Sequence, residues 1–391
     1  MLYFTKTKYD CTGCGACSAV CPVNCITFVR DGEGFDYPIA DSRCINCGNC
    51  ERVCPIMNNE DLFYTENVQK SFAGRHQEDA IWEKSASGGA FTAICNAYCN
   101  SGDVIYGAKF DGTEVIHDYI KSVENIGPFR KSKYVQSNMQ NSYKEIKNQL
   151  LQGHKILFSG TPCQIAGIRN YLGKTYANLL CVDLVCHGVA SPGVFERYIS
   201  YIEDKYKEKV KSYTFRGKKA KLGKLLQHVI TIEFQSGKKV QFENDLFNTA
   251  FIQTLLIRPS CSKCRYAKLQ RVGDLTIADF KNKHELLPDA KGLDNFSTII
   301  VNTDKGQQVL EKLKSMMKLY SVDIIDIQKT NPPIRNASVM NKSREEFFRD
   351  LNNLDPIDRI LKKYISKPKL IQKLWLGLPD RVRGTIKRRM K

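Results

Sequence analysis

The sequence predicts an α+β / α/β protein with a small cysteine-rich N-terminal module, a mixed α/β body and a helical basic tail. Three observations support this prediction. The first 58 residues repeat one cysteine pattern, the following stretch alternates between helical and strand-like patterns, and the C-terminal segment is strongly basic. With 391 residues, 42% hydrophobic and 26% charged, the composition is that of a globular chain of roughly two to three domains.

Sixteen cysteines are more than a chain of this length needs for folding. The sequence reaches Cys11 without the apolar segment of a secretory signal, and no apolar run approaches the roughly 18 residues of a membrane span. We therefore expect a cytoplasmic protein, in which thiols stay reduced and clustered cysteines bind metal.

The pattern CxxCxxCxxxCP occurs at residues 11–22 and again at residues 44–55. It resembles bacterial two-cluster ferredoxins, in which three cysteines of each run and the fourth cysteine of the other run hold one [4Fe–4S] cluster. A zinc module is the alternative, but zinc has no use for eight cysteines at this doubled spacing. The sequence thus predicts a ferredoxin-like domain over residues 1–58. Its expected ligands are Cys11, Cys14, Cys17 and Cys54 for one cluster, and Cys21, Cys44, Cys47 and Cys50 for the other.

Four more cysteines lie at element boundaries beside Pro or Gly: Cys163, Cys186, Cys261 and Cys264. Four is the number that one further cluster or a structural zinc requires. From spacing alone, a cluster, a zinc site and unconnected thiols all remain open. The other four cysteines, Cys25, Cys95, Cys99 and Cys181, are expected to be packing residues.

The body alternates strands and helices. We expect a helix after Gly89, a hairpin around Asp111, and a strand, helix and strand over residues 155–160, 161–173 and 179–186. Further expected elements are a helix over 192–207, a hairpin that turns at 236–237, a helix over 246–257, strands at 273–280 and 297–302, and helices near 305–318 and 342–363.

Five stretches occur in the order that is typical of one family: SASGGAFTAI at 85–94, KSKYVQS at 131–137, SGTPCQIAGIRNYL at 159–172, DLVCHGVASPGVFERYI at 183–199, and CSKCRYA with GDLTIADF at 261–280. On these motifs the chain resembles the coenzyme F-420 hydrogenase/dehydrogenase beta-subunit family. The resemblance implies an FAD- and [4Fe–4S]-binding oxidoreductase domain over residues 71–340, with an N-terminal part of about 71–155 and a C-terminal part of about 156–340. It favours a cluster at Cys163, Cys186, Cys261 and Cys264. One position departs from the family, since Lys281 follows ADF where an aromatic is common.

Small-residue turns in these motifs let backbone amides approach a pyrophosphate, whereas no GxGxxG motif follows a strand. A turn that binds nothing is the alternative. Lys133 and Tyr134 are candidates for contact with the phosphates or the ring. His187 is the candidate proton donor, with a structural histidine as the alternative. The expected cofactor-binding residues are Ser85, Ser87, Gly88, Gly89, Lys133, Tyr134, Thr161, Asp183 and Gly188.

Together these features predict an iron–sulfur flavoprotein oxidoreductase that passes electrons from a ferredoxin-type donor through [4Fe–4S] clusters to FAD and on to an organic substrate. The alternative is an electron-transfer beta subunit of a larger hydrogenase/dehydrogenase complex that uses coenzyme F-420 or a protein acceptor. The expected partner is ferredoxin or another redox protein. No nucleic acid is expected, because only one basic block and no reading motif is present.

The basic tail is assigned to residues 341–391. Residues 362–391 carry eleven Lys/Arg and one acid, Asp380, and so contribute +10 of the net charge of +18. Leucines and Trp375 accompany these charges. Such a segment is expected to contact an anionic membrane surface or to dock to an acidic partner, with a solvated tail as the alternative.

Overall fold

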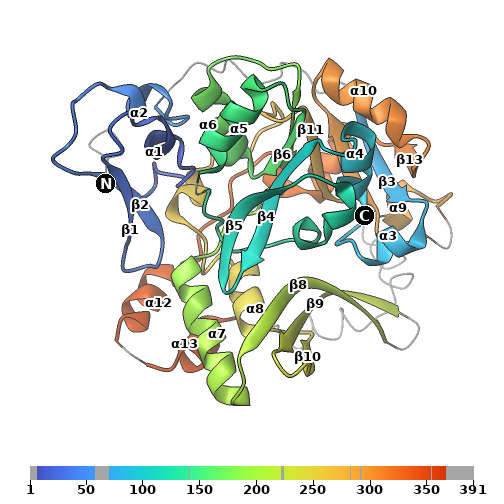
Figure 1. Ribbon diagram of the computed structural model, residues 1–391. Coiled ribbons are helices and arrows are strands. Elements are labelled where there is room, and N and C mark those ends of the chain that lie inside the picture. The colour runs from blue at the N-terminus through green and yellow to red at the C-terminus, as the bar shows by residue number, and fades with distance from the viewer. Residues whose placement is uncertain are drawn as a thin grey trace.

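The computed structural model describes residues 7–57, 70–139, 141–221, 224–281, 283–290, 293–353 and 355–366. The N-terminal module lies beside a large sheet with helices on both faces, and a smaller layer of strands and helices lies below both (Figure 1). Among the described residues, no helix combines the length and apolar character that a bilayer crossing needs.

The N-terminal module contains two short helices and one hairpin. Helices α1 (Ala16–Val20) and α2 (Asn49–Arg52) each follow a glycine in the left-handed region, Gly15 with φ 86° and Gly48 with φ 71°. Glycine adopts this conformation without steric cost, so each cysteine motif turns sharply into its helix. Strands β1 (Ile26–Arg30) and β2 (Asp36–Ala40) pair antiparallel between the two motifs.

The large sheet has eight strands, of which β11, β7, β6 and β4 are parallel to one another. The remaining neighbours pair antiparallel, so the sheet is mixed. In order across the sheet the strands are β13 (Met317–Ser321), β3 (Lys70–His76), β12 (Ser297–Val301), β11 (Leu275–Asp279), β7 (Leu179–Leu184), β6 (Ile156–Gly160), β4 (Val104–Asp111) and β5 (Glu114–Ile120).

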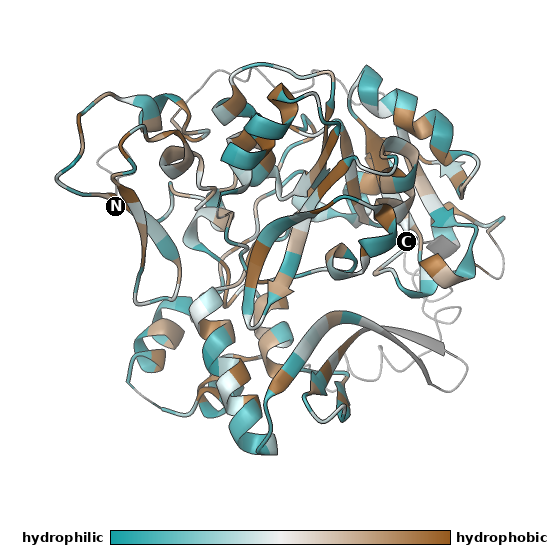
Figure 2. Ribbon diagram, viewed as in Figure 1, coloured by the Kyte–Doolittle hydropathy of each residue, from teal (hydrophilic) through white to brown (hydrophobic). Residues whose placement is uncertain are grey.

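Side chains of this sheet alternate between its two faces, as the pleat requires. In β6, Ile156 and Phe158 pack with helices α5 (Ser142–Leu151) and α6 (Pro162–Leu172), whereas Leu157 packs with α4 (Ala90–Tyr98) and α10 (Asp304–Leu313). Figure 2 shows hydrophobic stretches along the inner strands and mixed surfaces on the covering helices. Shorter helices at the edges are α3 (Asp79–Glu83), α9 (Lys283–Leu286) and α11 (Ile324–Thr330).

A second core lies between a three-stranded antiparallel sheet and four helices. Phe195, Phe215 and Phe247 are fully buried there and contact one another. The strands are β8 (Val210–Lys221), β9 (Lys224–Phe234) and β10 (Lys239–Phe242), and the helices are α7 (Pro192–Tyr206), α8 (Leu246–Ile252), α12 (Arg344–Leu351) and α13 (Ile357–Tyr364).

Most of the expected elements are present, and four differ. The helix expected near 305–318 ends at Leu313, and Met317–Ser321 is strand β13. Helix α8 ends at Ile252 rather than near 257, because Thr254 takes a φ of 58° and the chain then continues without helix towards Pro259. The single helix expected over 342–363 is two helices, with Pro356 preceding α13. Both pack into the second core, so the expected tail begins within the body; the basic residues from Lys367 onward lie outside the described residues.

Candidate functional site

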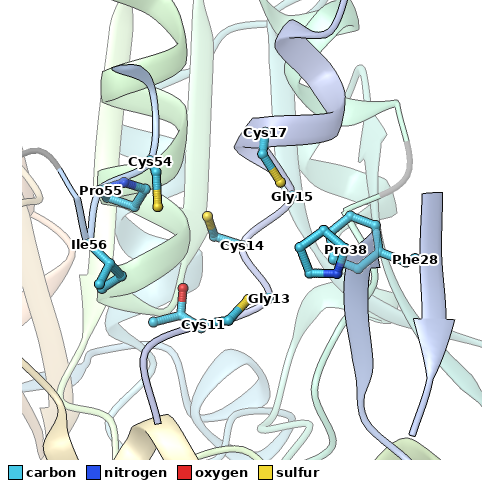
Figure 3. A pocket seen from close by; sticks show the side chains of 11 residues that line it. Cys11, Gly13, Cys14, Gly15, Cys17, Phe28, Pro38, Cys54, Pro55 and Ile56 are labelled. Atoms are coloured by element: carbon cyan, nitrogen blue, oxygen red, sulfur yellow. The ribbon is translucent and has the colours of Figure 1, made fainter. Parts of the chain in front are cut away.

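The first cysteine set faces one cavity. Cys11, Cys14 and Cys17 come from the first motif and Cys54 from the second, and all four line this cavity (Figure 3). Phe28 and Pro38 of the hairpin, with Pro55 and Ile56, complete its wall. The structure thus brings together the crossed set of four thiols that the spacing predicts.

These four thiols lie close enough to influence one another. Burial raises the pKa of Cys17, and the neighbouring Cys14, Cys11 and Cys54 raise it further. Cys11 and Cys14 are buried, and Cys17 and Cys54 are half-buried. Four grouped thiols beside apolar side chains suit a [4Fe–4S] cluster, which takes four thiolates and is tuned by its exposure to solvent.

The second set lies nearer to solvent. Cys44 and Cys47 are exposed, Cys50 is half-buried and Cys21 is buried. The sulfurs of Cys21 and Cys25 are 3.4 Å apart. Cys44, which belongs to the second motif, also contacts Cys25. Cys25 is therefore a buried neighbour of two expected ligands, which the sequence motif alone did not indicate.

The third set gathers cysteines from three separate segments. Cys163 lies in the first turn of α6, Cys186 follows β7, and Cys261 and Cys264 belong to a 3₁₀ turn and its C-cap at Pro259–Lys263. Burial raises the pKa of Cys186, and the nearness of Cys261, Cys163 and Cys264 adds to this effect. Gly188 permits this approach, because a Cβ there would lie 3.0 Å from Ile257 and 3.5 Å from the Cβ of Cys261.

The first and third sets meet at α6. A Cβ on Gly167 would lie 3.2 Å from both the Cβ and the Sγ of Cys14, so the cysteine loop packs directly on this helix. Cys14 shares one buried apolar cluster with Cys163 and Cys264. Within the described residues, no three Cys, His, Asp or Glu side chains converge tightly enough to hold a single metal ion. The ligand assignments therefore stay predictions that the cavity and these neighbour relationships support.

Arg258 lies between these sets, and sequence reasoning missed it. Its guanidinium is fully buried and donates to the carbonyl of Cys11 at 2.8 Å and to the side chain of Gln136 at 2.8 Å. The one local signal was a charged residue at the end of the apolar run LLIRP. Its importance depends on a contact between segments 247 positions apart.

The SASGG turn is held by partners within the protein. The hydroxyl of Ser85 donates to the carbonyl of Ile81 at 2.8 Å, and that of Ser87 contacts the hydroxyl of Ser297 at 2.8 Å. A Cβ on Gly88 would lie 2.1 Å from the carbonyl oxygen of Gly74. Only glycine fits at this position, where the turn packs against the backbone of β3. Gly89 has φ 91° and precedes α4 without a side-chain cap.

Arg216, which the sequence did not single out, joins three of the predicted motifs. Its guanidinium donates to the carbonyl of Ala86 at 3.2 Å, to the hydroxyl of Tyr134 at 3.1 Å and to the carboxylate of Asp279 at 2.7 Å. The ring of Tyr134 stacks on Phe251 at 4.8 Å, and His187 meets the same Phe251 edge-on at 5.5 Å.

Two buried atoms at this place have no partner among the described residues: the Nε of Arg216 and the Nε2 of His187. The other ring nitrogen of His187 lies 3.4 Å from the hydroxyl of Ser338. Burial lowers the pKa of His187. Unpartnered buried polar atoms beside an aromatic pair suit a polar, planar ligand such as a flavin.

Three further candidates have partners inside the protein. The carboxylate of Asp183 pairs with Arg271 at 3.1 Å and accepts from the N–H of Gly273 at 3.0 Å, so it fastens β7 to the segment before β11. Thr161 caps α6, and its hydroxyl lies 3.1 Å from the sulfur of Cys163. Lys133 donates to the carbonyls of Pro128 and Arg130, and burial lowers the pKa of Lys133 to about 7.

A ferredoxin-like module packed on an α/β body with four more grouped cysteines defines an iron–sulfur oxidoreductase component. Residues 153–326 match the family described as the C terminus of the coenzyme F420 hydrogenase/dehydrogenase beta subunit, and residues 10–58 match the 4Fe-4S dicluster domain. The chain therefore combines a region that matches this beta-subunit family with an N-terminal region that matches a domain of the kind that holds two [4Fe–4S] clusters.

A solved structure of the xenon-derivatized F420-reducing [NiFe] hydrogenase complex from Methanosarcina barkeri contains a similar chain. The two chains are 17% identical, the match covers 76% of this chain and 91% of that chain, and the TM-score is 0.41. No curated protein matches this chain.

Proposed function

We propose that this protein is an iron–sulfur flavoprotein that acts as an electron-transfer subunit of a hydrogenase- or dehydrogenase-type complex. The observation that carries the proposal is the packing of Cys14 on α6, where Gly167 leaves room for it and Cys163 begins the same helix. This contact puts the first ferredoxin-type cysteine set beside the cysteine set of the body. Electron transfer between two centres requires that they lie close together.

Three groups of cysteines would hold [4Fe–4S] clusters, each of which stores one electron. Cys11, Cys14, Cys17 and Cys54 would hold the buried cluster of the module, Cys21, Cys44, Cys47 and Cys50 the exposed one, and Cys163, Cys186, Cys261 and Cys264 the cluster of the body. The exposed Cys44 and Cys47 put the second set on the side that a redox partner can approach. The less exposed first set contacts the body through Cys14 and Gly167.

FAD would supply the conversion between one-electron and two-electron transfer. Gly89 precedes α4 without a side-chain cap. Burial lowers the pKa of His76 beneath this turn; Glu78 opposes this effect, and Arg130 and Arg75 reinforce it. An uncapped helix start near cations favours a diphosphate. The unpartnered Nε of Arg216 and Nε2 of His187 would donate to the ring or its ribityl chain, beside Tyr134.

The beta-subunit description of the matched family supports the complex, with coenzyme F-420 or a protein as the other redox partner. Reduction of an organic substrate is the second candidate. Lys281 favours it, because this cation replaces the aromatic that is common in the family and lies near enough to His187 to influence its pKa.

The test uses anaerobically purified full-length protein. We expect about twelve irons per chain with matching sulfide and one releasable FAD. Dithionite-reduced protein should pass electrons to coenzyme F-420 or to a co-purified redox subunit, whereas turnover of an organic compound by the isolated chain would favour the second candidate. Zinc in place of iron would exclude both.

A further inference from the structure

Arg258 occupies an unusual position for a charged side chain. It is fully buried, and its guanidinium lies 4.1 Å from the ring centroid of Tyr37. One nitrogen donates to the carbonyl of Cys11 at 2.8 Å and another to the carbonyl of Asp36 at 3.0 Å. The latter nitrogen also lies 3.8 Å from the sulfur of Cys11.

Among the described residues, no carboxylate pairs with Arg258. Its oxygen partners are two backbone carbonyls and the amide oxygen of Gln136, all of them neutral. The other buried arginines that link segments have a carboxylate: Arg271 pairs with Asp183 at 3.1 Å, Arg216 with Asp279 at 2.7 Å and Arg344 with Glu33 at 2.7 Å. A buried charge without a counter-ion is costly, so Arg258 requires an anion that these contacts do not supply.

The cysteines around Arg258 can provide that anion. Cys11 touches the guanidinium and belongs to the first set, while the N–H of Cys261, in the third set, donates to the carbonyl of Arg258 at 2.9 Å. The positive charge also lies close enough to Cys163 and Cys261 to act on both side chains. Four thiolates bound to a [4Fe–4S] core give a net negative group, and reduction adds one more negative charge.

We propose that Arg258 is the shared counter-charge of the clusters at the first and third cysteine sets, and that it raises their reduction potentials. The inference rests on the proposed function, since it assumes clusters at both sets. Arg258 favours the reduced form of each cluster because its charge would lie beside the added electron in the buried interior. In the step between them, one cluster loses the electron that the other gains. Arg258 thus acts on both clusters through its charge and takes no part in the transfer itself.

The test compares Arg258→Met, which removes the charge, with Arg258→Lys, which keeps it, in the full-length anaerobic protein. A dithionite titration followed by electron paramagnetic resonance gives the potentials. In Arg258→Met we expect the ratio of reduced to oxidised buried cluster at a fixed potential to fall at least tenfold, or about 59 mV for a one-electron couple. Arg258→Lys should stay within threefold of the wild type.

Arg344→Met is the matched control. Arg344 is also buried and also ties the module to the body through Glu33, but its partners are Glu33, the carbonyl of Ile257 and the ring of Phe348 rather than a cysteine. The cluster reduction potentials of Arg344→Met should equal those of the wild type. Equal shifts in both Met variants, or an unshifted Arg258→Met with full iron content, would overturn the proposal.

Arg258→Gln provides a second neutral variant if Arg258→Met does not fold. Loss of iron in both neutral variants and its retention in Arg258→Lys supports the proposal. Loss in all three counts against it, because charge is then not the determinant. The iron content of the wild-type protein tests the proposed function separately: about eight irons would remove the third cluster and leave the effect on the first cluster to be measured.

Discussion

The Nε of Arg258 donates a 2.8 Å hydrogen bond to the carbonyl oxygen of Cys11, 247 positions earlier in the chain. This bond ties the first cysteine motif to the segment that leads into Cys261 and Cys264. The ferredoxin-type module therefore packs directly on the body around Cys11. A substitution on one side of this contact should change the cysteine site on the other side.

Cys261→Ser should remove the cluster that we propose for the body and leave those of the module. Serine is a poor ligand for iron in these clusters, so we expect a loss of about four irons per chain. Iron and sulfide analysis of anaerobic protein measures this. Cys181→Ala is the control, because Cys181 is buried in β7 within an apolar cluster, and it should keep all its iron. Unchanged iron in Cys261→Ser would refute the third set.

Gly167→Val should disturb the first cluster from the body side. The added side chain would begin 2.6 Å from the hydroxyl of Tyr143 and 3.2 Å from the sulfur of Cys14, so overpacking should cost about 1–3 kcal/mol. The measurement is the loss of the first cluster's resonance signal. Gly127→Val is the control, since no atom lies within 4 Å of a Cβ there. Equal resonance signals from the first cluster in the two variants would argue against close packing of Cys14 on α6.

Arg216→Met should lower the flavin content. Arg216 holds Ala86, Tyr134 and Asp279 together, and its Nε is unpartnered among the described residues. We expect at least a tenfold loss of flavin affinity, or about 1.4 kcal/mol, measured by flavin released on heating and by rebinding of FAD. Arg197→Met, whose arginine contacts the carbonyl of Leu351 in the second core, should keep its flavin. If both variants retain flavin equally, Arg216 does not bind it.

His117 should make stability depend on pH. It is buried, its Nε2 contacts the carbonyl of Ser159 at 3.1 Å, and its Nδ1 contacts the hydroxyl of Ser137 at 2.9 Å. Burial lowers the pKa of His117 to about 4. The unfolded chain takes up a proton near pH 6.5 and the folded chain does not, so stability falls as the pH falls from about 6.5 towards 4.

At pH 5 this effect amounts to roughly 2 kcal/mol relative to pH 7. Urea unfolding of wild type and His117→Gln at the two pH values measures it. The variant should show a flatter pH dependence, whatever its stability at pH 7. Parallel curves for the two proteins would mean that His117 titrates normally in the fold.

The sequence predicted best what depends on local spacing. The crossed set of Cys11 and Cys54 follows from two repeated motifs, and the β-α-β order around Cys163 follows from periodicity and from Gly173. The counter-charge at Arg258 and the junction at Arg216 depend on segments that meet only in three dimensions, and no local pattern reports them. Gly88 was expected to face a cofactor, but a glycine needed for close backbone packing has the same local sequence as one that faces a phosphate.

Gly34 and Gly193 meet at the boundary between module and body, where a Cβ on Gly34 would lie 2.8 Å from the Cα of Gly193. Backbones that touch so closely leave no room for the module to swing as a tethered carrier. Charge would then pass through a fixed framework, so the internal step should be insensitive to solvent viscosity. Only the arrival and departure of partners would slow in a viscous medium.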